Sequence, residues 1–280
     1  MSKVAIVTDS ASDLPVAEAT ARGVTVVPLL VTFGDKEYRA GVDLTSEDFW
    51  RELTAPGAPF PKTAAAAPGA FRETFESLFA DGADEVVYVG VGGRLSGTLA
   101  SAKVARDMLP GRNIHVVDSN TASLGVGMLA YLGVEMAANG ESGANIATEL
   151  ERRCESVKLY VVLETLEYLK RGGRISAARA AIGGGLAVKP IITLEDGVVE
   201  TADRPRTRSR ARARLLELLV ATKPERIAIL HGQAPDIEAF AQELSAATGV
   251  PRSQISVNLI GPSVGPHVGP GAYGAVTMPA

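Results

Sequence analysis

Short stretches of hydroxyl and carboxyl side chains follow three apolar runs in the first half of the chain. Residues 8–10 read Thr-Asp-Ser, residues 118–121 read Asp-Ser-Asn-Thr, and the third stretch is Ser96, Gly97 and Thr98. Ligands of open α/β sheets bind at such strand ends. Ser96 stands where the N-cap of a helix belongs, and the free N–H groups of Gly97 and Thr98 would favour an anionic oxygen. The alternative interpretation is that Ser96 only caps its helix.

A histidine in a glycine- and proline-rich tail is the second candidate. His267 lies within residues 261–271, GPSVGPHVGPG, which we expect to form no periodic element. An imidazole held on such a loop can donate a hydrogen bond to a carboxylate or act as a base. The alternative is a histidine exposed on a surface loop. We expect His115 and His231 to be structural or exposed, and Cys154 to pack in the interior.

Arginine is concentrated in the second half of the chain. It occupies alternate positions at Arg204, Arg206, Arg208, Arg210, Arg212 and Arg214. Residues two apart do not share a helix face, and such a run usually marks a solvated surface. The functional alternative is a docking site for phosphates or for an acidic partner protein. With 28 Lys and Arg against 32 Asp and Glu, the formal net charge is −4, so a local docking site fits better than nucleic-acid binding.

Common nucleotide and hydrolase motifs are incomplete in this sequence. Gly90 and Gly92 begin a GxGxxG pattern, but position 95 is Leu, and the GK[ST] of a P-loop does not occur. Residues 93–97 read GRLSG, which places the serine one position late for the GxSxG of a hydrolase. These departures argue against dinucleotide-binding, NTPase and α/β-hydrolase functions.

The elements that must position these side chains alternate between strand and helix patterns. In the first half, strands are predicted over residues 4–7, 24–33, 36–39, 86–89 and 114–117, and helices over 14–22, 45–53 and 68–79. This alternation predicts a mainly parallel sheet covered by helices. In the second half, strands are predicted over residues 159–163, 191–194, 198–201, 227–230 and 255–260, and helices over 208–220 and 237–246. A hairpin turning at Asp196-Gly197 among these elements indicates a mixed sheet.

Length and composition indicate two packed cores. The chain has 280 residues, of which 46% are hydrophobic, and domains usually contain about 100–200 residues. We predict an N-terminal α/β domain over residues 1–157 and a C-terminal α/β domain over residues 158–280. A single cysteine and the absence of histidines four apart argue against a disulfide scaffold and common zinc motifs. No long apolar stretch or signal-peptide pattern is visible, so we expect a cytoplasmic protein without a transmembrane segment.

Several short motifs resemble, in the same order, those of the DegV family. They are VAIVTDSASDL at residues 4–14, Lys62-Thr63 before Pro68-Gly69, LSGT at 95–98, LKRGGRI at 169–175, and the tail of residues 260–271. The resemblance implies two α/β domains with a long-chain fatty acid buried in the cleft between them. It implies a bacterial lipid-binding subunit without turnover of its own. A separate ATP-binding fatty acid kinase would phosphorylate the carboxylate, and the acyl phosphate would enter phospholipid synthesis.

The same resemblance assigns roles to individual residues. Thr63 and Ser96 would hydrogen-bond the fatty-acid carboxylate, and His267 would lie beside it. To these we add the backbone N–H groups of Gly97 and Thr98, from the predicted helix start. The resemblance also assigns a role to two arginines, Arg174 and Arg206, the second being the best match in a later RTR segment. They would lie at the carboxylate end or on the kinase-docking face. No metal, cofactor or nucleic acid is expected, and transient contact with a membrane surface is compatible with the resemblance.

Two positions depart from the family pattern. Residues 64–67 are all alanine where the family often carries Ser or Gln, which removes polar side chains near the expected mouth of the site. Arg94 places a charge where small polar residues are common, and it either adds a cation near the ligand or faces solvent. Neither departure removes an expected contact.

Two other functions stay open on the sequence. A stand-alone serine esterase or acyl-transfer enzyme would use Ser96 as nucleophile, His267 as base and Asp118 to orient the histidine, although the displaced GxSxG pattern argues against it. A regulatory module would instead sense a small anion through the arginine-rich segment.

Overall fold

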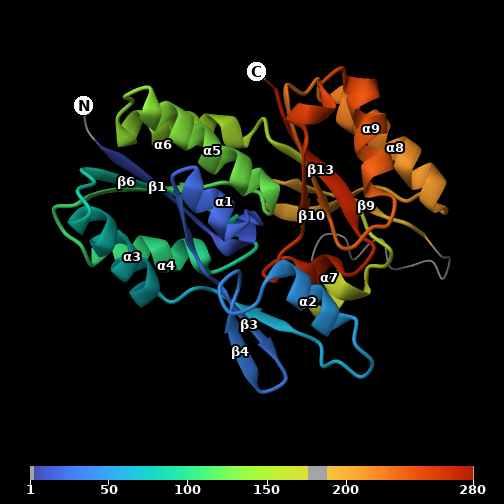
Figure 1. Ribbon diagram of the computed structural model, residues 1–280, viewed down its shortest axis with the longest axis horizontal. Helices are drawn as coiled ribbons and strands as arrows, with labels where there is room; N and C mark the ends of the chain where they lie inside the picture. The colour runs from blue at the N-terminus through green and yellow to red at the C-terminus, as the bar shows by residue number, and fades with distance from the viewer. Residues whose placement is uncertain (1–2, 176–187, 280) are drawn as a thin grey trace.

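A parallel four-stranded sheet organises the first half of the chain. The computed structural model describes residues 3–175 and 188–279. The sheet has the order β2-β1-β6-β7, with β1 (Val4–Asp9), β2 (Val24–Val27), β6 (Glu85–Gly90) and β7 (Asn113–Asp118). Its faces are covered by α3 (Pro68–Ala80) and α4 (Thr98–Asp107) on one side, and by α5 (Leu124–Ala138) and α6 (Gly143–Cys154) on the other (Figure 1). The short helix α1 (Val16–Ala21) packs beside β2.

Both faces of this sheet are buried, which explains its short apolar strands. Successive strand residues point to opposite faces. In β1, Ile6 therefore packs with the α5 and α6 side, and Val7 packs with Phe71 and Phe75 of α3. A parallel sheet covered by helices on both faces requires such runs, and the predicted α/β class is confirmed.

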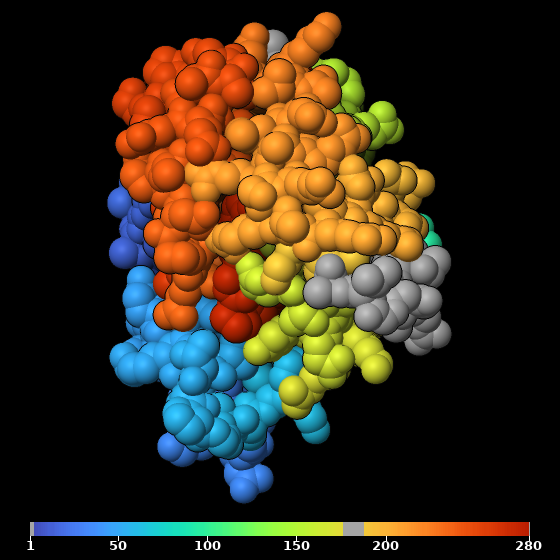
Figure 2. Space-filling model, turned by 90° about the vertical axis from the view of Figure 1, so that its right-hand side faces the viewer, coloured from blue at the N-terminus to red at the C-terminus, as the bar shows by residue number. Residues whose placement is uncertain are grey.

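A mixed six-stranded sheet organises the second half. Its order is β10-β9-β8-β13-β11-β12, with β8 (Lys158–Val162), β9 (Ile191–Glu195), β10 (Val198–Asp203), β11 (Arg226–His231), β12 (Ser256–Leu259) and β13 (Tyr273–Met278). Helices α8 (Arg208–Ala221) and α9 (Ile237–Thr248) cover its outer face, which appears in orange in Figure 2. The predicted hairpin of β9 and β10 is confirmed. The other face of the sheet turns toward the first half of the chain.

The sequence analysis missed the central strand of this mixed sheet. β13 lies between β8 and β11, and all six of its residues are buried. Because both faces of β13 are buried, its sequence YGAVTM has no alternation of polar and apolar residues. The strand also follows directly on the glycine- and proline-rich tail, and the sequence analysis assigned no element after that tail.

The segment predicted as one strand over residues 24–33 is two strands in different sheets. Pro28 has no N–H group to continue the ladder, and the Leu29 N–H donates to Ser10 Oγ at 2.8 Å. The chain therefore leaves the parallel sheet after β2, and β3 (Leu30–Phe33) begins a small antiparallel sheet of order β4-β3-β5. The other strands of this small sheet are β4 (Lys36–Arg39) and β5 (Lys62–Ala64). The pairing of β3 with β5 positions Thr63.

The glycine- and proline-rich tail contains a helical turn, contrary to the prediction of a loop. α10 (Gly265–Val268) packs against α7 (Glu167–Arg171). Pro266 suits the first turn because its missing N–H would have no partner there. A Cβ atom at Gly265 would lie 2.2 Å from the ring of Phe49, so only glycine allows this approach. His267 is consequently held on a short helix that packs against α7 and against Phe49.

The helix α2 (Ser46–Leu53) links the small sheet to the second half. The predicted helix start at residue 45 is confirmed, and Thr45 caps the helix by accepting a hydrogen bond from the Asp48 N–H at 3.1 Å. Trp50 is fully buried, and its indole N–H donates to the Ile260 carbonyl at 2.8 Å. The boundary predicted after residue 157 stays a prediction. The parallel sheet uses only residues before it and the mixed sheet only residues after it. No helix of the described residues is long and apolar enough to span a membrane.

The bond between Trp50 and Ile260 generates a stability prediction. Trp50→Phe removes the donor and leaves the buried Ile260 carbonyl unpaired, which should lower the free energy of unfolding by about 1–3 kcal/mol. Urea unfolding followed by circular dichroism measures the change. Tyr131→Phe is the control, because its hydroxyl bonds the exposed Glu18 at the surface and its loss should have little effect. Equal stability of the two variants would contradict the role of this hydrogen bond.

Candidate ligand-binding site

A deep pocket lies between the parallel sheet and the inner face of the mixed sheet. It encloses about 780 Å³ of space free of protein atoms, including its open mouth. Its apolar walls are formed by Ala11, Leu29, Val91, Leu95, Ala122, Leu159, Val161, Leu169, Ile192, Leu194, Val199, Leu230, Val264 and Val268. Small-molecule sites usually have such apolar walls and a few placed polar groups.

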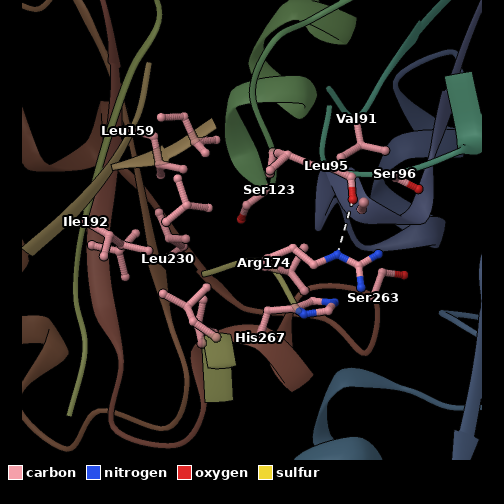
Figure 3. A pocket seen from close by; sticks show the side chains of 18 of the residues that line it. Val91, Leu95, Ser96, Ser123, Leu159, Arg174, Ile192, Leu230, Ser263 and His267 are labelled. Atoms are coloured by element: carbon pink, nitrogen blue, oxygen red, sulfur yellow. Dashed lines mark hydrogen bonds between the residues drawn. The ribbon is translucent and has the colours of Figure 1, made fainter. Parts of the chain in front are cut away.

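Several polar side chains of the pocket gather at one end, while Ser123 and Thr193 also line it. Figure 3 shows Ser96, Arg174, Ser263 and His267 on one side, and Leu159, Ile192 and Leu230 on the other. Thr63 also lines the pocket. The arrangement suits a ligand with a long apolar part and one anionic head group.

His267 is neutral in this environment. Burial, and secondly the positive charge of Arg174, lower the pKa of His267 to about 4. Its Nε2 lies 3.1 Å from Thr63 Oγ1, and its Nδ1 is buried without a hydrogen-bond partner among the described residues. A Cβ atom at Gly172 would lie 2.2 Å from Nδ1, which explains why the KRGGR segment has glycine there. The imidazole therefore offers hydrogen bonds without adding a second positive charge.

Arg174 supplies the positive charge at this end of the pocket. Its Nε donates to the Leu95 carbonyl at 3.2 Å (Figure 3), and its Nη1 donates to the Gly172 carbonyl at 2.7 Å. Within the described part of the chain, these bonds occupy two of the five N–H donors of the guanidinium. The remaining donors can bind a carboxylate in the bidentate geometry that arginine favours.

The predicted helix start differs in one detail from the structure. α4 begins at Thr98, so the N-cap position is Gly97 rather than Ser96. Ser96 Oγ still accepts from the Thr98 N–H at 3.2 Å and lies 2.8 Å from Thr98 Oγ1. Ser96 lines the pocket, whereas Gly97 and Thr98 are absent from its lining. The pocket thus brings together Thr63, Ser96, Arg174 and His267.

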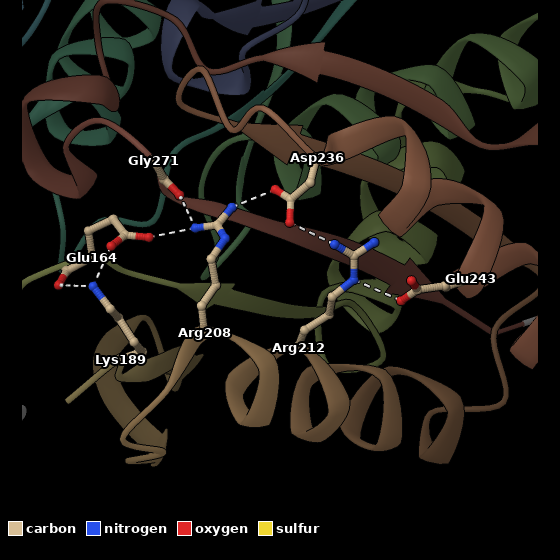
Figure 4. Close-up of polar contacts among 7 residues, drawn as sticks. All are labelled: Glu164, Lys189, Arg208, Arg212, Asp236, Glu243 and Gly271. Carbon is tan, nitrogen blue, oxygen red and sulfur yellow. Dashed lines mark hydrogen bonds and ion pairs between the residues drawn. The ribbon is translucent and has the colours of Figure 1, made fainter.

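The arginine-rich segment lies elsewhere and is largely paired with carboxylates. Arg208 bonds Glu164 at 2.5 Å and Asp236 at 2.6 Å, and Arg212 bonds Asp236 and Glu243, each at 2.7 Å (Figure 4). Arg214 is also paired, with Asp203 and Glu217. These contacts contradict the interpretation of the whole segment as a free basic patch. Arg206 is exposed on the loop before α8 and does not line the pocket.

The side chains of the esterase alternative do not form a hydrogen-bonded triad. Ser96 Oγ bonds Thr98, and His267 Nε2 bonds Thr63. Asp118 accepts from the backbone N–H groups of Gly93 and Asn120 and thereby shapes the loops after β6 and β7. The described residues also contain no cluster of three or more His, Cys, Asp and Glu side chains that could hold a metal ion.

Comparison with known proteins identifies the family. Residues 3–280 match the family model described as "Uncharacterised protein, DegV family". The chain belongs to the DegV family. It is 35% identical, over 283 residues and 98% of both chains, to a DegV domain-containing protein of Caldanaerobacter subterraneus.

Solved DegV structures share the whole fold of this chain. A DegV family protein from Thermus thermophilus, described by its fatty acid binding, is 36% identical with a TM-score of 0.91, over 99% of this chain and 100% of that one. A stearic-acid-binding protein from Eubacterium ventriosum is 28% identical with a TM-score of 0.88, over 100% of this chain and 98% of that one. The resemblance read from the motifs is therefore confirmed.

The opening motif of this DegV chain contains two buried carboxyl groups, Asp9, which lies in one of the predicted strand-end stretches, and Asp13, which the sequence analysis did not single out. Asp9 accepts hydrogen bonds from the Tyr88 hydroxyl and from the N–H groups of Ala11 and Val91. Burial raises its pKa. Ala11 and Val91 both line the pocket. By binding the backbone N–H groups of these two residues, Asp9 holds this part of the pocket wall in position. Carboxyl side chains directly after a buried strand were the available signal.

Asp13 joins three segments around the polar end of the pocket. It accepts from Ser123 Oγ at 2.5 Å and from the Gly261 N–H at 2.9 Å. Asp13 and Ser123 have φ values of 53° and 55°, a conformation that non-glycine residues adopt only when their surroundings hold them. Ser123 and Ser263 line the pocket, and Ser263 Oγ lies 2.8 Å from Ser10 Oγ. Both serines were missed because their partners are distant in sequence.

The buried position of Asp13 predicts a pH-dependent stability. Burial raises its pKa from 3.8 to about 7, so the folded state holds this proton more tightly than the unfolded chain. The contribution of Asp13 to stability is therefore complete below about pH 4 and is lost as the pH rises to about 7. The Asp13→Asn variant has no carboxyl group to ionise and should not lose stability in this way. Between about pH 4 and pH 7, the free energy of unfolding of the variant should therefore rise, relative to that of the wild type, by on the order of 4 kcal/mol.

Urea unfolding of both proteins at several pH values measures the difference. Asp43→Asn is the control, because Arg39 holds the pKa of the exposed Asp43 at about 2. The stability difference between Asp43→Asn and the wild type should therefore change with pH only below about pH 4. A difference between Asp13→Asn and wild type that does not change with pH would refute the assignment.

Proposed function

We propose that this chain binds a long-chain fatty acid in the pocket, with the carboxylate at Thr63, Ser96, Arg174 and His267. The observation that carries the proposal is the pocket itself, whose long apolar walls end at a cluster of hydrogen-bond donors around one arginine. The fatty acid binding described for the similar Thermus protein supports it. The chain would act as a carrier without turnover or cofactor of its own.

The energetics of such a ligand fit the two ends of the pocket. Burying an acyl chain of about 16 carbons, at about 0.8 kcal/mol for each methylene, contributes roughly 12 kcal/mol before ordering costs. An isolated carboxylate would lose more on burial than several methylenes gain. Arg174, two hydroxyls and a neutral imidazole can replace its water. The single charge of Arg174 would balance the single charge of the ligand.

The first experiment is mass spectrometry of lipid extracted from the purified protein. We expect a stoichiometric long-chain fatty acid. Thr63→Ala and Ser96→Ala should each weaken its binding by roughly tenfold to a hundredfold, because a hydrogen bond to a charged group contributes about 1.5–3 kcal/mol. Ser101→Ala, on α4 but outside the pocket lining, is the control and should bind like the wild type. A protein that stays empty after incubation with fatty acids would refute the proposal.

We further propose that the bound carboxylate is presented to a separate ATP-dependent fatty acid kinase. The family motifs imply this partner, and another cavity adjoins the carboxylate end of the pocket. A shallow cavity lined by Arg94, Gly173 and Val198 shares Leu95, Arg174 and Val199 with the pocket. A partner could therefore approach the carboxylate from this side.

Arg206 tests the partnership separately from lipid binding. Because Arg206 is exposed and outside the pocket lining, Arg206→Ala should lower acyl phosphate formation with the kinase at least tenfold and leave the bound lipid unchanged. Acyl phosphate is assayed with ATP, kinase and fatty acid, and retained lipid by mass spectrometry. Arg152→Ala, an exposed arginine on α6, is the control. A loss of lipid instead of coupling would show that Arg206 acts at the pocket.

A further inference from the structure

A second cavity lies behind the apolar end of the pocket. This outer cavity is lined mainly by polar side chains, among them Asn120, Glu155, Lys158 and Glu195. It encloses about 1000 Å³ of space free of protein atoms, including open solvent. The lining residues common to the pocket and the outer cavity are Leu159 and Leu194. These two side chains therefore separate an apolar compartment from a polar one.

The two leucines form one wall because of the strand register. β8 and β9 are antiparallel, with Tyr160 opposite Thr193. The pairing ends there, and the next residues on the two strands, Leu159 and Leu194, lie on the face that also carries Val161 and Ile192 into the pocket. Side chains on one face of neighbouring strands interact with each other, so these two leucines can close the end of the pocket together. In Figure 3, Leu159 lies at the end of the pocket away from Ser96.

The hairpin that carries Leu194 is fastened to the first half of the chain. Arg94 Nη1 donates to the Asp196 carbonyl at 3.1 Å, at the turn between β9 and β10. A Cβ atom at Gly197 of the same turn would lie 3.2 Å from Asn120 Oδ1, so the turn packs closely there. These contacts hold the β9–β10 hairpin, and with it Leu194, against the first half of the chain. The structural role of Arg94 is therefore to fasten this hairpin.

We propose that Leu159 and Leu194 form the end wall of the site and set the longest acyl chain that it accepts. The inference rests on the proposed fatty-acid binding. Each methylene added short of the wall gains about 0.8 kcal/mol, or roughly fourfold in affinity. A methylene beyond the wall must displace the leucines or enter the polar outer cavity, where it gains nothing. Affinity therefore rises with chain length to a maximum and then falls.

The test is a series of saturated fatty acids of about 12 to 22 carbons, measured by displacement of a fluorescent fatty acid. Leu194→Ala removes most of one wall side chain and should move the affinity maximum to acids longer by about two to four carbons. Leu194→Phe enlarges the side chain and should move the maximum to shorter acids. Leu216→Ala, a half-buried leucine of α8 outside both cavities, is the control and should keep the wild-type maximum.

The possible results separate the inference from the proposed function. If all variants bind fatty acids with the wild-type maximum, the end wall is not where we place it, although fatty-acid binding stands. If the wild type binds no fatty acid of the series, the proposed function fails. Circular dichroism checks that each variant is folded. If Leu194→Ala does not fold, Leu194→Phe decides alone, because an unchanged maximum in that variant overturns the proposal.

Discussion

The hydrogen bonds between the loop after β1 and the tail of the chain determine where the rest of the site lies. Asp13 binds the Gly261 N–H, and Ser10 binds Ser263, so residues about 250 positions apart are joined in a buried environment. From this junction α10 places His267 against α7. A buried polar group is costly unless it is paired, so the tail is held to this one arrangement.

The neutral His267 and the cationic Arg174 beside it follow from that arrangement. α7 and the residues after it bring Arg174 beside His267, and burial together with this charge keeps the imidazole unprotonated. The positive charges of the α8 arginines are neutralised within the protein. Arg208 and Arg212 pair with the carboxylates of Glu164, Asp236 and Glu243. The positive charges of Arg208 and Arg212 therefore hold loops together, whereas the charge of Arg174 lies in the pocket, where a ligand can bind it.

Local patterns in the sequence predicted most of the elements and part of the site. Strand and helix periodicity, caps and turns are local signals, so β6, β7, α2, α3 and the β9–β10 hairpin were predicted close to their observed bounds. β13 depends on which sheet a segment joins, and no local signal carries that information. Pro28, by contrast, is a local signal for a break, which the prediction of one strand over residues 24–33 did not use. The same distinction applies to the site. Thr63, Ser96, Arg174 and His267 stood in recognisable motifs, whereas Ser123 and Ser263 acquire their positions through partners distant in sequence.

The pocket also shows why its two ends must be built from different parts of the chain. The polar end combines Ser96 and Arg174 on loops and His267 on the short helix α10 with Thr63 on the edge strand β5. An apolar wall needs adjacent strands, whose paired side chains leave no polar backbone exposed. The polar end accordingly uses Thr63, Ser96, Arg174 and His267 from four separate segments, and the apolar end uses Leu159, Ile192 and Leu230 from one sheet. Changes in the strand side chains can therefore alter the length of the cavity without moving the groups that would bind the carboxylate.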